Sequence, residues 1–216
     1  EISTSINHEE IKHSISQLLK ISYIQEKNFK ITFFCLDGNC TKPNLYIYFI
    51  NSQYPNNADY QNGVKVELIS TERFNPNIKT ENFELRAISD KLMCLAQSCE
   101  ALLVNDDEYI TEGSRSNFFA VIDNKLVTPP ATEVLEGITR KMVIKLANEN
   151  SIAIIERPIH RSEIFTMDGA FITGTSSKIL PIKKIGDHEF NGIPDTTRKL
   201  QELYDNLVDE YIAKHS

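Results

Sequence analysis

Two stretches of the sequence contain side chains whose types and spacing suit catalysis. Lys79 lies in a short polar segment, residues 77–82, between a strand-like run and a helix-like run. Glu112 lies in residues 110–117, where a glycine, two serines and an asparagine follow it. The interval between Lys79 and Glu112 accommodates one helix and one strand, so both side chains can face one cleft.

A lysine and a carboxylate in one cleft are groups that pyridoxal phosphate requires. The lysine amine forms a Schiff base with an aldehyde, and a carboxylate can face the ring nitrogen. Two further segments offer sites for a phosphate. Residues 137–140 begin a predicted helix, whose first backbone N–H groups and positive dipole end favour an anion. Residues 173–177 follow an apolar strand, and their small side chains let backbone N–H groups approach an anion closely.

Each of these features also has a simpler interpretation. A single lysine is most often a solvated surface charge, and residues 137–140 could be an ordinary helix cap. The other two polar segments could be plain turns. The prediction of a cofactor site therefore depends on the joint occurrence of one amine, one carboxylate and two phosphate-type segments, each at the end of a strand or helix.

The composition is that of an ordinary globular protein. Of the 216 residues, 41% are apolar and 25% are charged, and the net charge is −7 with no basic run. This charge argues against a nucleic-acid surface and against binding to an anionic membrane. No apolar stretch approaches the roughly 20 residues that span a bilayer, and residues 1–5 lack the pattern of a signal peptide. We therefore expect a cytoplasmic protein.

Hydrophobic periodicity predicts a mixed α and β fold with two lobes. The boundary between the lobes is expected near residues 71–80. Residues 53–62 are rich in asparagine and predict a loop. The expected helices are 8–19, with Asn7 as its cap, 85–99, with one buried face, 139–150 and 196–213, with a short one near 161–165. The expected strands are 30–36, 45–51, 63–70, 101–105, 109–111, 117–122, 125–127, 152–156, 170–173 and 180–185.

The four cysteines form two pairs, Cys35 with Cys40 and Cys94 with Cys99. A spacing of five lies at the loose edge of zinc-site patterns. In a helix, however, a step of five turns by about 140° and separates Cys94 from Cys99. No histidine lies close by in sequence, so buried, reduced thiols are favoured over a metal site.

Four segments together resemble the class IV, or fold type IV, pyridoxal-phosphate enzymes. These are the branched-chain and D-amino acid aminotransferases and aminodeoxychorismate lyase. The resemblance runs in order and at the family's spacing from about residue 8 to the C-terminus. It implies a two-lobe α+β fold that usually forms a homodimer, with a partial small α/β domain over 1–72 and a larger, barrel-like cofactor-binding domain over 73–216. The matching segments are 76–83, 111–118, 135–140 and 171–176.

The resemblance also implies roles for individual residues. Lys79 would carry the cofactor and then move the proton at the substrate's α-carbon, and Glu112 would keep the pyridine nitrogen protonated. The phosphate would be bound by Ile138, Thr139 and Thr175, with Ser176 near the phosphate or the substrate carboxylate. The same pocket would be lined by Ser116 and Asn117.

The sequence also departs from the family pattern. By the resemblance, it would begin inside the usual small lobe, and we expect it to be without the N-terminal segment, which in the family carries an arginine that clamps the phosphate. Phe83 stands where some members have a tyrosine hydroxyl. Residues 37–42 lack the Arg-x-His pair with which D-amino acid transaminases hold the substrate carboxylate.

The leading hypothesis is an aminotransferase that moves an amino group between a small amino acid and a 2-oxo acid. An aminodeoxychorismate-lyase-like eliminase would use the same Lys79 and Glu112. A non-catalytic, dimerising remnant of the same fold is an alternative from a different class, and cofactor binding would discriminate it from an enzyme.

Overall fold

The computed structural model describes residues 7–22, 28–34, 44–50, 54–71 and 82–215. The chain divides into two compact units, Glu1–Gln53 and Tyr54–Ser216. This division precedes the boundary expected after residue 72, because the strand Val64–Ser70 pairs with strands of the second unit. The identity of the two units as a partial small domain and a cofactor-binding domain stays a prediction.

The described residues of the first unit form one helix and a two-stranded antiparallel sheet. Helix α1 spans His8–Ser22, and strands β1 (Asn28–Phe34) and β2 (Asn44–Ile50) pair with Phe29 opposite Phe49. Asn7 caps α1 as predicted, since its Oδ1 accepts hydrogen bonds from the backbone N–H groups of Glu9 and Glu10. The side-chain oxygen thereby satisfies two amides that the first helical turn leaves without a partner.

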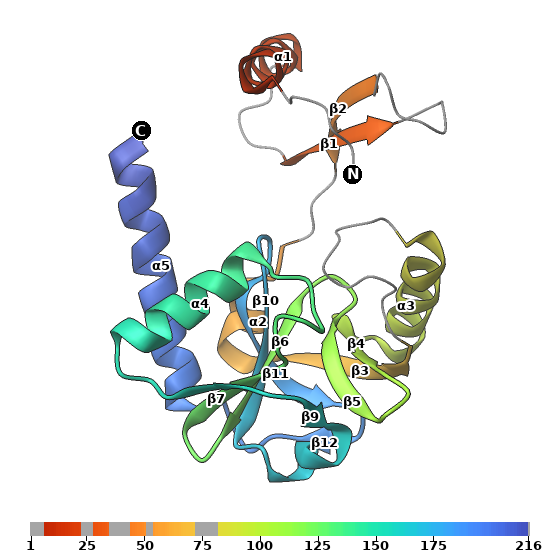
Figure 1. Ribbon diagram of the computed structural model, residues 1–216, viewed down its shortest axis with the longest axis vertical. Helices are drawn as coiled ribbons and strands as arrows, with labels where there is room; N and C mark the ends of the chain where they lie inside the picture. The colour runs from red at the N-terminus through yellow and green to blue at the C-terminus, as the bar shows by residue number, and fades with distance from the viewer. Residues whose placement is uncertain (1–6, 23–27, 35–43, 51–53, 72–81, 216) are drawn as a thin grey trace. The chain divides into compact units, whose positions relative to one another are not determined.

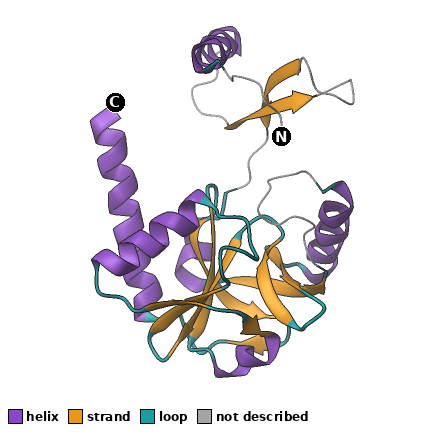
Figure 2. Ribbon diagram, in the orientation of Figure 1, coloured by secondary structure: helices purple, strands orange, loops and turns teal. Residues whose placement is uncertain are grey.

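The second unit is built on a barrel of six strands (Figures 1 and 2). The strand order is β6–β10–β11–β3–β4–β5, and the pairing of β5 with β6 closes the ring. Strands β7, β8, β9 and β12 extend the sheet beyond the ring. The ring strands are β3 (Val64–Ser70), β4 (Glu100–Val104), β5 (Tyr109–Gly113), β6 (Asn117–Ile122), β10 (Gly169–Gly174) and β11 (Lys178–Ile185). The others are β7 (Lys125–Thr128), β8 (Ile154–Glu156), β9 (Ile159–His160) and β12 (His188–Glu189).

Alternation along the ring strands divides the apolar side chains into two cores. Phe118 and Ala120 belong to the core inside the ring, whereas Phe119 and Val121 belong to the core outside it. Helices α4 (Ile138–Glu149) and α5 (Asp195–His215) contribute Val143 and Leu200 to the outer core. Figure 1 shows α4 and α5 on one side of the barrel and α3 (Phe83–Ala96) on the other. The predicted mixed α and β class is confirmed.

Three details of the fold differ from the sequence predictions. Part of the expected loop 53–62 is helix α2 (Asn57–Asn62), which begins with a capping box between Asn56 and Asp59. In α3, which contacts β3 and β4, only part of the expected face is buried: Leu85 and Ser89 are buried, whereas Leu95 is 75% exposed. The thiols of Cys94 and Cys99 are exposed rather than buried, and Cys35 and Cys40 lie outside the described residues.

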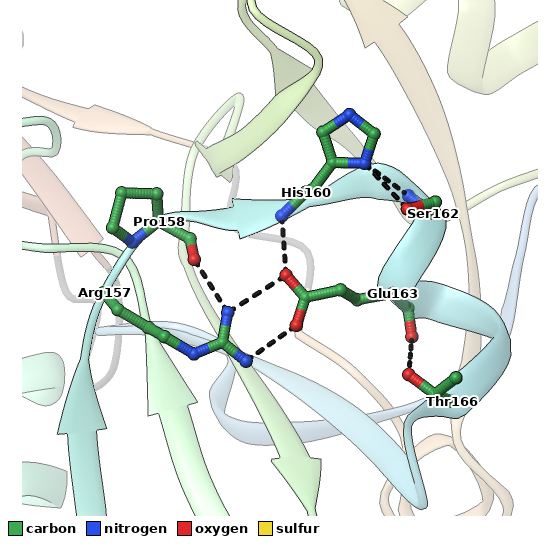
Figure 3. A network of polar contacts seen from close by, with 6 residues as sticks. All are labelled: Arg157, Pro158, His160, Ser162, Glu163 and Thr166. Carbon is green, nitrogen blue, oxygen red and sulfur yellow. Dashed lines mark hydrogen bonds and ion pairs between the residues drawn. The ribbon is translucent and has the colours of Figure 1, made fainter.

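A carboxylate network closes the turn after β8 (Figure 3). The side chain of Glu163, in the 3-10 helix Arg161–Thr166, accepts two hydrogen bonds from Arg157 at 3.0 and 2.6 Å. Its Oε1 also accepts the backbone N–H of His160 at 2.9 Å. The bonds from the guanidinium lower the pKa of Glu163 and raise the pKa of Arg157.

Among the described residues, no helix is both long and apolar enough to cross a bilayer. In the same part of the chain, no group of three or more histidine, cysteine, aspartate or glutamate side chains is placed to hold a metal ion.

Candidate functional site

Glu112 is buried at the end of β5, with 2% of its surface exposed. Its Oε2 accepts a hydrogen bond from the backbone N–H of Leu135 at 3.2 Å. A buried carboxylate is costly unless it is hydrogen-bonded or paired, so the fold must supply partners for Glu112. The carboxylate that the sequence singled out is therefore held inside the barrel unit and not on its surface.

Asn117 begins β6 directly opposite Glu112 in the antiparallel β5–β6 pair. Its Nδ2 donates a hydrogen bond to the carbonyl oxygen of Leu135 at 2.7 Å. Glu112 and Asn117 therefore bind the two polar backbone groups of the same residue. A Cβ atom on Gly137 would lie only 2.3 Å from the Asn117 Oδ1, so glycine allows the segment before α4 to approach this side chain.

The N-terminus of α4 follows this junction immediately. Gly137 is its N-cap residue, and no side chain caps the first turn. The first-turn amides of Ile138 and Thr139 thus keep the arrangement that favours an anion. Ile138 is 72% exposed, whereas Thr139 is buried with its Oγ1 3.5 Å from the hydroxyl of Tyr204. The predicted phosphate-type segment is therefore a helix N-terminus in contact with the Glu112 and Asn117 pair.

The charges next to α4 are already paired. Lys141 forms an ion pair with Glu136 at 2.9 Å, and this contact lowers the pKa of the Glu136 carboxyl. Arg140 is almost fully buried, and its Nη2 contacts the Glu156 Oε2 at 2.6 Å and the Pro129 carbonyl oxygen at 3.0 Å. Because the carboxylate of Glu136 is balanced by Lys141, it opposes an anion at the helix end less strongly.

Thr175 and Ser176 lie exposed in the turn between β10 and β11. Their turn is near the same junction, because Thr173 pairs with Asn117 across β10 and β6. A Cβ atom on Gly174 would lie 3.7 Å from the carbonyl oxygen of Arg115. Thr173 adds a buried hydroxyl without a hydrogen-bond partner in the structure. The second phosphate-type segment is thus adjacent to the turn that follows Glu112.

Ser116 contacts a carboxylate that is not part of the predicted site, and its role in lining the pocket stays a prediction. Its Oγ donates to the Oε2 of Glu100 at 2.8 Å, inside the turn between β5 and β6. Sequence reasoning did not single out Glu100, which is 4% exposed. A signal was present, because Glu100 is the only charged residue of β4, a strand in which all five residues are buried.

Lys79 lies outside the described residues, and its role stays a prediction. The described chain resumes close to it: the Asn82 Oδ1 accepts the backbone N–H of Leu85 at 3.0 Å and caps α3. Phe83 is 73% exposed at the first position of that helix. The structure therefore brings together Glu112, Asn117, the start of α4 and the turn after β10, without showing the lysine.

Comparisons with known proteins identify the family. A family model described as amino-transferase class IV matches residues 1–185. A protein of Aquifex aeolicus described as a probable branched-chain-amino-acid aminotransferase is 30% identical over 230 residues, which cover 96% of this chain and 71% of the relative. A Methanocaldococcus jannaschii relative with a similar description is 34% identical over 148 residues, or 67% of this chain. That match spans about half, 51%, of the relative's length.

A solved structure shows the same fold. The branched-chain amino acid aminotransferase of T.th., complexed with N-(5'-phosphopyridoxyl)-L-glutamate, matches with a TM-score of 0.76 and 21% identity. The match covers 94% of this chain and 71% of that chain. The architecture of the described units is therefore that of the fold type IV aminotransferases, as the sequence resemblance implied.

Proposed function

The chain belongs to the amino-transferase class IV family, which depends on pyridoxal phosphate, and we propose that it is itself an aminotransferase. Its substrates would be a small amino acid and a 2-oxo acid. The observation that carries the proposal is the junction at Leu135, where Glu112, Asn117 and the segment leading into α4 meet. A cofactor with a basic ring nitrogen and a phosphate fits a buried carboxylate beside an uncapped helix N-terminus.

Each site residue has a defined task in this proposal. When bound, pyridoxal phosphate supplies an electron sink for negative charge at the substrate's α-carbon. Lys79 would bind the cofactor's aldehyde and move the proton at that carbon. Glu112 would keep the ring nitrogen protonated, and Asn117 would hold the segment before α4 in place. The phosphate would be bound by backbone and hydroxyl groups of Ile138, Thr139, Thr175 and Ser176.

A lyase of the same family is the nearest alternative, because it would use the same lysine and glutamate. The two activities differ in their requirement for an acceptor: transamination consumes a 2-oxo acid, and elimination does not. The proposed transamination is therefore tested by dependence of turnover on an added 2-oxo acid. A remnant without catalysis would bind no cofactor at Lys79.

The decisive test is borohydride reduction of the protein with pyridoxal phosphate, followed by peptide mass mapping. We expect a pyridoxyl group on Lys79 in the unmodified sequence, and no such adduct in Lys79→Ala. Lys91→Ala is the matched control, since Lys91 is an exposed lysine on α3. Its adduct at Lys79 should equal that of the parent protein. A folded protein without an adduct at Lys79 would contradict the proposal.

We also propose a homodimer in the cytoplasm, as the family resemblance and the composition imply. The molar mass in solution, measured by light scattering with and without pyridoxal phosphate, tests the assembly. A mass of one 24.6 kDa chain at micromolar concentration would exclude a stable dimer.

A further inference from the structure

We propose that Glu100 is a positioning residue that holds Glu112 in place through the turn between β5 and β6. Only the catalytic consequence of this role rests on the proposed function, because it depends on what Glu112 does for the cofactor. The anchoring of Glu112 by Glu100 is a statement about the protein without its cofactor, and it can be tested there.

Glu100 accepts four hydrogen bonds, all from uncharged donors. Its Oε1 accepts the backbone N–H of Ala101 at 2.9 Å and the hydroxyl of Ser114 at 2.6 Å. Its Oε2 accepts the backbone N–H of Arg115 at 3.2 Å and the hydroxyl of Ser116 at 2.8 Å. Three of the four donors belong to residues 114–116, so the carboxylate fastens that turn to the start of β4.

The turn that Glu100 fastens separates the two residues of the candidate site. Glu112 precedes the turn and Asn117 follows it, and the two are paired across β5 and β6. The packing leaves little freedom, because a Cβ atom on Gly113 would lie 2.1 Å from the Ser116 Oγ and 3.0 Å from the Glu100 Oε2. A displacement of the turn must therefore move Glu112 relative to Leu135.

The chemistry of the four bonds requires a carboxylate and not an amide. Each oxygen of Glu100 accepts one backbone N–H and one hydroxyl. A hydroxyl can rotate to accept instead of donate, but a backbone N–H cannot. In Glu100→Gln the NH2 group would face the backbone N–H of either Ala101 or Arg115, whichever way the amide is turned. This nearly isosteric change consequently breaks the anchor.

The first measurement is amide hydrogen exchange of the full chain without cofactor, followed by NMR. The Leu135 N–H reports on Glu112 directly, since it donates to the Glu112 Oε2. In Glu100→Gln we expect its exchange to accelerate at least about tenfold, the scale of one lost hydrogen bond. Glu108→Gln is the matched control: it makes the same change of charge at the other end of β5, where Glu108 pairs with Arg161 on the surface. It should leave Leu135 exchange unchanged.

The second measurement uses the protein loaded with pyridoxal phosphate that carries a 15N label in the ring. The ring-nitrogen chemical shift in Glu100→Gln should move toward the value in Glu112→Gln, and kcat should fall more than KM rises. If the parent protein binds no cofactor, the proposed function fails, but the exchange measurement still decides the role of Glu100.

Unchanged exchange of the Leu135 N–H in folded Glu100→Gln would overturn the inference. If that variant does not fold, Ser114→Ala replaces it, because the change removes a single donor to Oε1. A smaller acceleration at Leu135 would then support the anchor. No acceleration would contradict it.

Discussion

Two glutamates in this protein fasten a turn, and they do so with opposite chemistry. Glu163 is partly exposed and binds the guanidinium of Arg157, six residues away in sequence. Glu100 is buried and binds hydroxyls and backbone amides, three of them 14 to 16 residues away. The first turn lies after β8 (Figure 3), and the second separates Glu112 from Asn117.

This difference in burial and in donors explains why the two carboxylates should contribute differently to the stability of the protein. Solvent and salt screen the attraction between Arg157 and Glu163, so losing this ion pair should lower the free energy of unfolding only slightly. Solvent and salt screen the contacts of the buried Glu100 much less, and a lost acceptor leaves the N–H of the buried residue Ala101 without its partner. We therefore expect the stability of the protein to depend much more on the buried carboxylate.

The largest predicted effect is that of Glu100→Ala. The change leaves the amides of Ala101 and Arg115 without their acceptor, which should lower the free energy of unfolding by about 2–4 kcal/mol. Denaturant unfolding measures this loss. Raising the salt concentration to 1 M should not restore stability, because the donors are uncharged. A loss below about 1 kcal/mol would show that the buried carboxylate is no anchor.

Gly113→Ala should be the next most destabilising change. Its Cβ would lie 2.1 Å from the Ser116 Oγ, so the hydroxyl that binds Glu100 must move. Such overpacking costs about 1–3 kcal/mol in unfolding experiments. The control is Gly192→Ala, where a Cβ meets nothing within 4 Å. Equal effects of the two alanines would mean that the turn tolerates displacement.

Local signals explain how much of the fold the sequence predicts. Apolar runs such as 117–122 and helical stripes such as 139–150 predicted elements that the structure contains as β6 and α4. Helix α2 was missed because its capping box lies in an asparagine-rich stretch that resembles a loop. The exposed side of α3 was mispredicted because a periodic stripe indicates a preference for burial but not which neighbours cover it.

The residues of the candidate site could be predicted from the sequence where they belong to short, contiguous motifs. Glu112, Asn117, Ile138 and Thr139 follow from motifs at element ends, and the structure places them at one junction. Glu100 could not be found in the same way, because its partners lie in another strand connection. Lys79 is outside the described residues, so its position in the site stays a prediction.

Glu163→Gln should have a modest effect that depends on pH and salt. The Arg157 contact lowers the pKa of Glu163, so its contribution is complete above the unfolded-state pKa and is lost as the pH falls through the folded-state pKa. At pH 7 and low salt we expect a loss of about 1 kcal/mol at most, since both side chains are partly exposed. The difference from the parent protein should shrink below pH about 4 and at 1 M salt. A difference constant from pH 3 to 7 would be inconsistent with an ion pair.

Arg115→Ala should have the smallest effect. It compares a contact to the buried Glu100 with an exposed ion pair, because Arg115 makes both. The backbone N–H of Arg115 donates to Glu100, whereas its exposed guanidinium pairs with Asp90 of α3. The substitution keeps the first contact and removes the second. Because exposed ion pairs contribute little, we expect a change in unfolding free energy below about 0.5 kcal/mol and unaltered exchange of the Leu135 N–H. If Arg115→Ala instead matched Glu100→Ala, the turn would be held from the surface by α3 and not from the interior by Glu100.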